Sequence, residues 1–562
     1  MVFSDRWLGW VVSSAWFLVA LAAAIALKMV VVSDLTVLIQ YNPQDDGLYV
    51  ARAYHLLTEG NFGPYDARTL VKLPGMSFWL AGGRLLGFPY LWSINILYIL
   101  AGCYLLVGAL QCGAAKPVAL GAFVLYLFNP ITMGGEWIRV IREPLSTGLF
   151  VLLLASALFV LLRLEGRRFP VGHMAVFSMV FAFSLLLREE DIVLYAVLAI
   201  LGMAAWWTTK RIGPPSTATR AFVISIVVVP LLLAGAANAA ARQFIEHHYG
   251  LPILHDFSEG EFPKLIAAMR SIESKKDNRY VMVTQERLKK LLVEVPSLVP
   301  VINRLPLPGP GTASCQWYKI CSELSNGWMQ FWIKDAAWEA GLTPDLPKAQ
   351  DFFRAAREDI ERACGQGRLK CNSNGSKLLP PFEFRWTRAY MQELFTLLAM
   401  TVAPNAYLTE TRPERYEVDA SFGRIFQFVT LTHDFDTDVH ARGITTTVPR
   451  YASPLANWRL TIGDIYRVLG PIIVLLTVGA LAVRLALWRK APLGTLSLLA
   501  AIFLGYLLIR IAALSYVAVY LGHFDSRLVF STHSFILLIG LFVMADAIDA
   551  VRAARSRGLG HG

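Results

Sequence analysis

Charge is scarce in this sequence. Asp, Glu, Lys and Arg make up 17% of its 562 residues, whereas hydrophobic residues make up 55% and the mean hydropathy is +0.49. A soluble protein of this length carries more charge than that. Several apolar runs approach the roughly 20 residues that a helix needs to cross a bilayer. The composition therefore excludes a soluble protein and predicts an all-α polytopic membrane protein.

Other absences narrow the interpretation. No clear small-residue cleavage site follows the first apolar run, residues 7–32, so we interpret it as a retained helix and not as a signal peptide. Neither an internal repeat nor a low-complexity tract is recognisable. The net charge of +11 suggests nucleic acid at first sight, but much of it lies at the ends of apolar runs, as the positive-inside rule expects. We therefore expect membrane lipids as partners and no nucleic acid.

One short apolar run decides the topology. The longer runs are residues 7–32, 90–110, 118–133, 145–162, 171–187, 192–208, 221–241, 465–488, 493–520 and 528–551. The short run, residues 76–88, is interrupted by Gly82, Gly83 and Arg84. If it crossed the membrane, the basic turns at 163–168 and 210–220 would face outside, against the positive-inside rule. We therefore predict that it lies along the outer interface, which gives about ten spanning helices with both termini inside.

This topology divides the chain into three parts. Residues 1–241 form an N-terminal membrane module of seven spanning helices, and residues 465–562 form the last three. Between them, residues 242–464 form an extracytoplasmic domain. Apolar residues recur at helical spacing in 284–295, 327–341 and 348–364, whereas LPLPGPG at 305–311 indicates a loop. We expect this domain to be mostly helical.

Cysteine usage supports the outer location of that domain. Cys315 and Cys321 form a C-x5-C pattern, and Cys364 and Cys371 form a C-x6-C pattern. A zinc site stays open as an alternative, but these spacings are looser than the usual C-x2-4-C and no His pair accompanies them. Two local disulfides, and hence an oxidising compartment, are the favoured interpretation.

Charged residues other than membrane-end anchors gather in four outer turns. The turns contain Asp45, Asp46, Arg52 and Lys72; Glu136, Arg139, Arg142 and Glu143; Arg188, Glu189, Glu190 and Asp191; and His523, Asp525 and Arg527. One such turn can be merely solvated, and adjacent acids such as Asp45 and Asp46 can merely cap a helix. Four turns with mixed acid and base at one membrane surface instead predict a site.

Group transfer from a lipid-linked phosphate is the chemistry that uses this mixture. Basic side chains can neutralise a leaving phosphate, and a carboxylate can take the proton of an attacking hydroxyl. We assign the phosphate to Lys72, Arg139, Arg142 and Arg52, the base to Asp45 or Asp46, and the cavity to Arg188, Glu189, Glu190, Asp525 and Arg527. Asp46 and Glu189 are candidate ligands for a divalent cation such as Mg²⁺, Mn²⁺ or Ca²⁺.

The first outer loop also resembles a known family. An acidic pair after the first helix, Tyr and Arg on a short helix, the turn GNFGPY and a Lys before proline, within residues 42–79, are similar to the first outer loop of GT-C superfamily glycosyltransferases. Lipid A aminoarabinose transferases and protein O-mannosyltransferases are nearest in appearance. The resemblance implies an external active site, a polyprenyl-phosphate sugar donor, inversion, a catalytic acid at Asp45 or Asp46, and Lys72 near the lipid phosphate.

The loop departs from the family pattern at two places. It has Asp45-Asp46 where Asp-Glu is usual, and Lys72-Leu73-Pro74-Gly75 where Lys-Pro-Pro or His-Pro-Pro is usual, so the register at Lys72 is open by one residue.

We expect a glycosyltransferase of a bacterial cytoplasmic membrane, with its active site facing the periplasm or exterior. It would move a hexosyl or pentosyl group from a polyprenyl-phosphate donor to a glycan, lipid or protein acceptor. A flippase for a lipid-linked glycan is one alternative, although transporters place charges near the bilayer midplane in two related halves, which are not recognisable here. An oligosaccharide polymerase or ligase is the other, because it would need similar groups.

Overall fold

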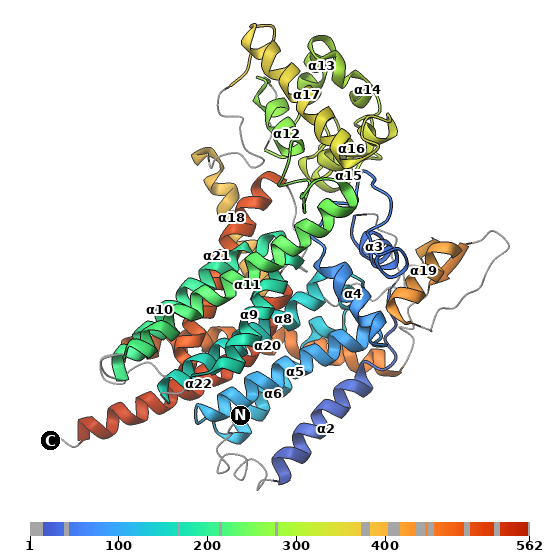
Figure 1. Ribbon diagram of the computed structural model, residues 1–562. Coiled ribbons are helices and arrows are strands. Elements are labelled where there is room, and N and C mark those ends of the chain that lie inside the picture. Colours follow the sequence, from blue (N-terminus) through green and yellow to red (C-terminus); the bar gives the residue numbers. More distant parts are fainter. Residues whose placement is uncertain are drawn as a thin grey trace.

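The computed structural model describes residues 15–38, 44–166, 169–212, 216–275, 279–372, 383–402, 416–432, 444–447, 454–487, 495–521 and 529–559. Figure 1 shows a bundle of long helices with a smaller helical domain above it. The N-terminal part contains α2 (Ala15–Val31), α3 (Asp46–Thr58), α4 (Gly75–Leu85), α5 (Tyr90–Gln111), α6 (Lys116–Leu127), α7 (Gly135–Ile138), α8 (Arg142–Glu165), α9 (Val171–Leu187), α10 (Leu194–Ile212) and α11 (Thr217–Tyr249).

The remaining helices follow α11. They are α12 (Phe262–Ser271), α13 (Gln285–Glu294), α14 (Val299–Ile302), α15 (Ala313–Tyr318), α16 (Asn326–Glu339), α17 (Leu346–Gly365), α18 (Thr387–Val402), α19 (Ala420–Thr430), α20 (Pro454–Ala486), α21 (Thr495–Leu521) and α22 (Phe530–Leu559). Strands β1 (Tyr416–Asp419) and β2 (Ile444–Thr447) form one antiparallel pair. Short 3₁₀ helices lie at Pro130–Met133, Glu189–Val193, Pro296–Leu298 and Phe384–Trp386.

Within the described residues, seven helices are long and apolar enough to cross a membrane: α5, α8, α10, α11, α20, α21 and α22. Helices α2, α6 and α9 are apolar but shorter. The predicted class, a helical polytopic membrane protein, is confirmed, whereas the number of ten spanning helices is not. Helix α4 has 11 residues, so it extends about 16 Å and is too short to span. This agrees with the interfacial position predicted for residues 76–88.

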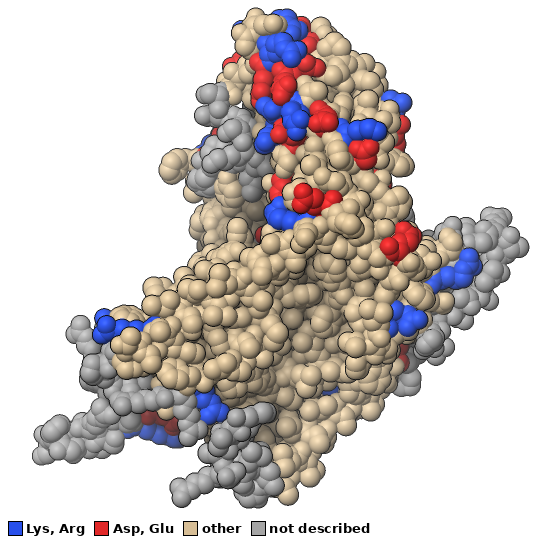
Figure 2. Space-filling model, in the orientation of Figure 1, with Lys and Arg blue, Asp and Glu red and all other residues tan. Residues whose placement is uncertain are grey.

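Helix α8 is the centre of the bundle. In its most apolar window 89% of the residues are buried, compared with 17% for α11 and 28% for α20. The outward residues of α11 and α20 are large and apolar, for example Leu232 and Leu475. In Figure 2, charged side chains gather on the upper domain, and the broad flank of helices below it is almost free of them. That flank has the composition of a lipid-facing surface.

The ends of the helices separate two sides of the bundle. The start of α8 lies beside the end of α9, where the Arg142 guanidinium donates a hydrogen bond to the carbonyl of Leu187. The opposite end of α8 contacts the start of α21, where the Thr495 hydroxyl donates to Glu165. Basic residues lie at that second end of several helices: Lys116, Arg163, Lys210, Arg211 and Arg484. By the positive-inside rule we expect the second end to be cytoplasmic and the Arg142 end to be external.

Residues 250–372, here called the outer domain, have their own core. It includes Phe262, Leu288, Ile333 and Phe353, one from each of α12, α13, α16 and α17. Helices α18 and α19 pack elsewhere, α18 against α21 and α19 against α3 and α4. The bounds of the helices also extend beyond the predicted domain limits, since α11 continues to Tyr249 and α20 begins at Pro454.

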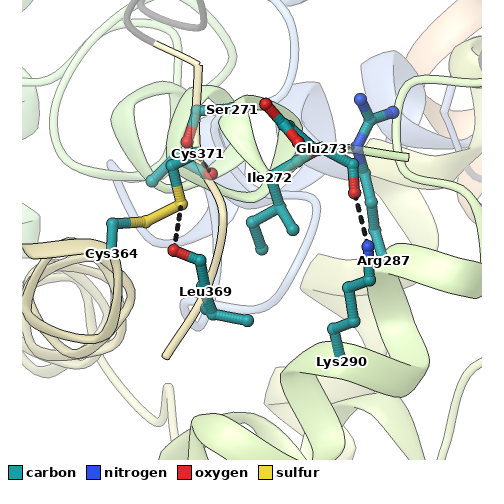
Figure 3. The surroundings of a disulfide bond; sticks show 9 residues. Ser271, Ile272, Glu273, Arg287, Lys290, Cys364, Leu369 and Cys371 are labelled. Atoms are coloured by element: carbon teal, nitrogen blue, oxygen red, sulfur yellow. Dashed lines mark hydrogen bonds between the residues drawn. A yellow bond between two sulfur atoms is a disulfide. The ribbon is translucent and has the colours of Figure 1, made fainter. Parts of the chain in front are cut away.

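The structure contains both predicted disulfides, Cys315–Cys321 and Cys364–Cys371. The second joins the end of α17 to a segment that pairs with the end of α12 (Figure 3). In that pairing the Glu273 amide donates to Lys370 O at 2.8 Å and the Asn372 amide donates to Ser271 O at 2.8 Å. The disulfide therefore holds the segment at 370–372 between the ends of α12 and α17.

The first loop lies against the outer domain through several polar contacts. The Tyr249 hydroxyl accepts from the Phe62 amide at 3.0 Å and donates to Gly63 O at 2.8 Å. Arg68 binds Asp335 of α16 through two hydrogen bonds of 3.1 and 2.6 Å. These contacts hold residues 62–68 between the bundle and the outer domain.

Thiol labelling tests the topology. We expect a membrane-impermeant maleimide to modify Cys315 and Cys371 only after reduction, and only when it is added from the extracytoplasmic side, because both are in disulfides of the outer domain. Cys103 and Cys112 carry free thiols, so they are the control residues whose labelling does not depend on reduction. Labelling of Cys371 from the cytoplasmic side in sealed inverted vesicles would contradict this topology.

Candidate active site

Asp45 and Lys72 lie together at the Arg142 end of the bundle. The Lys72 ammonium is 3.9 Å from the Asp45 carboxylate, and the two side chains are 22% and 15% exposed. Asp45 precedes α3, but its side chain makes no capping hydrogen bond to that helix. The capping role that adjacent acids allow is therefore not the role of Asp45. An acid and a base that were 27 positions apart in the sequence thus share one partly open site.

Asp46 has a different environment from its neighbour. It is fully buried, and its carboxylate accepts two hydrogen bonds from Arg139, at 2.6 and 3.4 Å. Arg139 also binds Glu136 at 2.9 Å. Both carboxylate oxygens of Asp46 therefore face a guanidinium, and this pair fixes the start of α3 to the turn before α8.

Arg142 is the first residue of α8 and faces the turn after α9. It binds Glu189 at 2.5 Å, and Glu189 accepts a further bond of 3.5 Å from the Leu73 amide. The same carboxylate therefore contacts Arg142 and the segment that contains Lys72. Turns that are far apart in the sequence therefore meet here.

Two predicted phosphate ligands have other partners. Arg52 is 2% exposed, donates to Lys72 O at 2.9 Å and stacks over Phe62 at 4.2 Å. Burial lowers the pKa of Arg52 to about 10. Arg139 binds Asp46 and Glu136, as described above. These contacts give Arg52 and Arg139 a role in holding the first loop, and their contact with the donor phosphate stays a prediction.

The predicted cavity residues are only partly placed. Arg188 is 2% exposed and lies 3.8 Å from Glu143 and 3.2 Å from the Ser146 hydroxyl. Asp525 and Arg527 lie outside the described residues, as does the side chain of Glu190.

The predicted cation ligands do not fit a resident metal ion in their observed positions. The Asp46 carboxylate is bound by Arg139, and the Glu189 carboxylate by Arg142. Hard cations prefer several convergent oxygen ligands without a competing cationic side chain. In the described part of the chain, moreover, no group of three His, Cys, Asp or Glu side chains is arranged to hold a metal. A divalent cation stays a prediction, and no step below uses it.

Sequence reasoning missed Tyr49 and His255. Tyr49 is buried, its hydroxyl has no hydrogen-bond partner among the described residues, and burial raises its pKa, with Asp45 and Glu189 adding to the rise. Four positions after Asp45, it lies on the same face of the helix, and this spacing is the signal that was available. His255 of the outer domain is buried 3.5 Å from Glu189. No local pattern in the sequence indicates that contact.

Gly75 allows the loop to approach the bundle closely. A Cβ at this position would lie 2.7 Å from the backbone oxygen of Leu186, near the end of α9. Because a backbone atom cannot move aside easily, a side chain here would push α4 away from α9. The absence of a side chain at Gly75 therefore keeps Lys72 near Glu189.

The Asp46–Arg139 pair yields a stability prediction. We expect Asp46→Asn to lower the free energy of unfolding by about 3 kcal/mol, because it leaves the buried Arg139 without its charged partner. Glu136→Gln, at the more exposed end of the same arginine, should cost about 1 kcal/mol or less. Thermal unfolding in detergent checks the order of the two variants. Equal losses would show that Asp46 is not the principal partner of Arg139.

Two solved structures are similar to this chain. The crystal structure of ArnT from Cupriavidus metallidurans bound to undecaprenyl phosphate has 14% sequence identity and a TM-score of 0.27, and the match covers 96% of this chain and 78% of that chain. The crystal structure of the same protein in the apo state has 12% sequence identity and a TM-score of 0.28, and this match also covers 96% of this chain and 78% of that chain. No protein-family model matches, and neither does any curated protein. These low identities and TM-scores assign no role to any residue, so the roles of the residues depend on the geometry of this site.

Proposed function

We propose that this protein is an inverting glycosyltransferase of the cytoplasmic membrane that uses a polyprenyl-phosphate sugar donor at its external surface. The observation that carries the proposal is the pairing of Asp45 and Lys72 at 3.9 Å, partly open to solvent, beside the Arg142–Glu189 pair. A proton acceptor next to two cationic groups fits the transfer of a group away from a phosphate. The first-loop motif of residues 42–79 points to the same donor class.

Asp45 is the proposed base. Asp46 is less suited, because it is fully buried and both its oxygens face Arg139. Asp45 is 15% exposed and therefore more accessible to an acceptor hydroxyl.

The proposed reaction is a single displacement at the anomeric carbon. An acceptor hydroxyl oxygen forms the new bond to C1 as Asp45 takes its proton, and the bond between C1 and the phosphate oxygen breaks. The bonding electrons leave with the polyprenyl phosphate, whose added negative charge is stabilised by Lys72 and Arg142. Attack from the side opposite the phosphate inverts the anomeric centre.

The position of the site is consistent with a donor held in lipid. Arg142 is the first residue of the apolar helix α8, and the Lys72 segment contacts its partner Glu189, so a phosphate could bind there while its polyprenyl chain remains beside the bundle. We propose that the transferred group is a hexosyl or pentosyl residue. The acceptor is a glycan, a lipid or a protein that reaches the external side of a bacterial cytoplasmic membrane.

Transfer assays with matched variants test the proposal. We expect the purified protein to release label from one member of a panel of undecaprenyl-phosphate hexoses and pentoses, to an acceptor or to water. Asp45→Asn should lower kcat at least about a hundredfold, because it removes the proton acceptor. Lys72→Met should mainly raise KM for the donor, because it removes a contact with the phosphate.

The controls are Asp351→Asn and Lys348→Met in α17, whose side chains are 71% and 69% exposed. Both should retain the activity of the unaltered protein. Full activity in Asp45→Asn would exclude it as the base. If no donor loses its sugar, and reconstituted protein moves lipid-linked glycan across vesicles in both Asp45→Asn and Lys72→Met, the flippase alternative replaces the proposal.

A further inference from the structure

The segment before Pro74 is held at four consecutive residues by groups from other parts of the chain. The contacts are Asp256 N to Leu70 O at 2.9 Å, His255 Nε2 to Val71 O at 3.1 Å, Arg52 to Lys72 O at 2.9 Å and Leu73 N to Glu189 at 3.5 Å. Two of these four contacts come from the outer domain. The backbone that carries Lys72 is therefore positioned in part by residues 255 and 256.

The partners of His255 define its proton positions. A backbone carbonyl can only accept, so Nε2 carries the proton and donates to Val71 O. Nδ1 lies 2.8 Å from the Ser258 hydroxyl and accepts from it. Burial lowers the pKa of His255, which favours the neutral ring that this arrangement requires. The Val71 carbonyl thus selects the tautomer, and the Ser258 hydroxyl helps to orient the ring.

The His255 ring is also linked to Arg142, the second cationic group of the site, through Glu189. Nε2 lies 3.5 Å from Glu189, and Glu189 binds Arg142. Its neighbour Asp256 forms a buried ion pair with Lys334 of α16, so the loop is attached to the core of the outer domain. A displacement of this loop would therefore change both the Lys72 segment and the Glu189–Arg142 pair.

We propose that His255, oriented by Ser258, is the positioning residue through which the outer domain sets the locations of Lys72 and Arg142. The inference rests on the proposed function for its catalytic consequence, because Lys72 and Arg142 are the groups assigned to the donor phosphate. Its structural content is independent of that function, since it states that the His255–Val71 contact helps to hold the Lys72 segment.

Two substitutions of similar size separate positioning from simple packing. His255→Gln keeps an N–H donor near the place of Nε2, whereas His255→Leu removes the donor from the Val71 carbonyl. Ser258→Ala leaves the ring but removes the hydroxyl that orients it through Nδ1. His247→Gln and His247→Leu, at an exposed residue of α11, are the matched controls.

The first readout is the reactivity of Lys72 with a water-soluble amine-acylating reagent, followed by mass spectrometry. Lys348 of α17 serves as the internal reference. In His255→Leu the loss of one buried hydrogen bond should change the Lys72 acylation rate about fivefold or more relative to Lys348. His255→Gln should stay close to the unaltered protein, Ser258→Ala should lie between them, and the His247 variants should show no change.

The second readout is transfer from the donor identified above. His255→Leu should raise KM for the donor about tenfold with a smaller effect on kcat, and His255→Gln should restore KM. Unchanged Lys72 reactivity in both His255→Leu and Ser258→Ala, or equal KM defects in His255→Gln and His255→Leu, would overturn the inference. If His255→Leu does not fold, Ser258→Ala and His255→Gln decide the question.

The two readouts distinguish the failures. Altered Lys72 reactivity without transfer from any donor would support the positioning role and contradict the proposed function. Normal transfer, together with unaltered Lys72 reactivity in the His255 and Ser258 variants, would support the proposed function and contradict the positioning role.

Discussion

The buried ion pair between Asp46 and Arg139 is the interaction on which the site depends. It joins the start of α3 to the turn before α8, and α8 is the most deeply buried span of the bundle. Charged groups removed from water are costly unless they are paired and hydrogen-bonded, so this contact has little freedom to rearrange. Adjacent Asp45 is thereby held at the edge of the bundle. Asp46 thus has a structural partner in the bundle, whereas Asp45 stays partly exposed.

The rest of the site follows from where the first loop is placed. Residues 62–73 lie between the bundle and the outer domain, with contacts to Tyr249, Asp335 and the loop at 255–256. The close approach of Gly75 to α9 brings Lys72 near Glu189. The outer domain is consequently part of the scaffold of the site, and not only an attached module.

Much of the bundle was predictable because apolar runs and helix bounds follow from hydrophobic period alone. Helix α9 has the predicted bounds, and both disulfides join cysteines that are close in sequence. The charged turns were predictable as a group, since topology brings them to one side. Their pairings were not. Whether Arg52 or Arg139 faces a phosphate or a protein acceptor depends on packing between distant segments, and the contact of His255 with Val71 is a tertiary contact across 184 positions. No short-range pattern encodes such contacts.

The attachment of residues 255 and 256 to the Lys72 segment has a consequence for how the protein matures. The ribosome makes the Asp45 loop early, but the loop lacks two of its backbone partners until residues 255 and 256, beyond α11, have been made and folded. A nascent chain threaded only through its opening helices would carry every acid and base of the first loop without the geometry that makes them useful. The geometry of the first loop would therefore be complete only after the outer domain has folded.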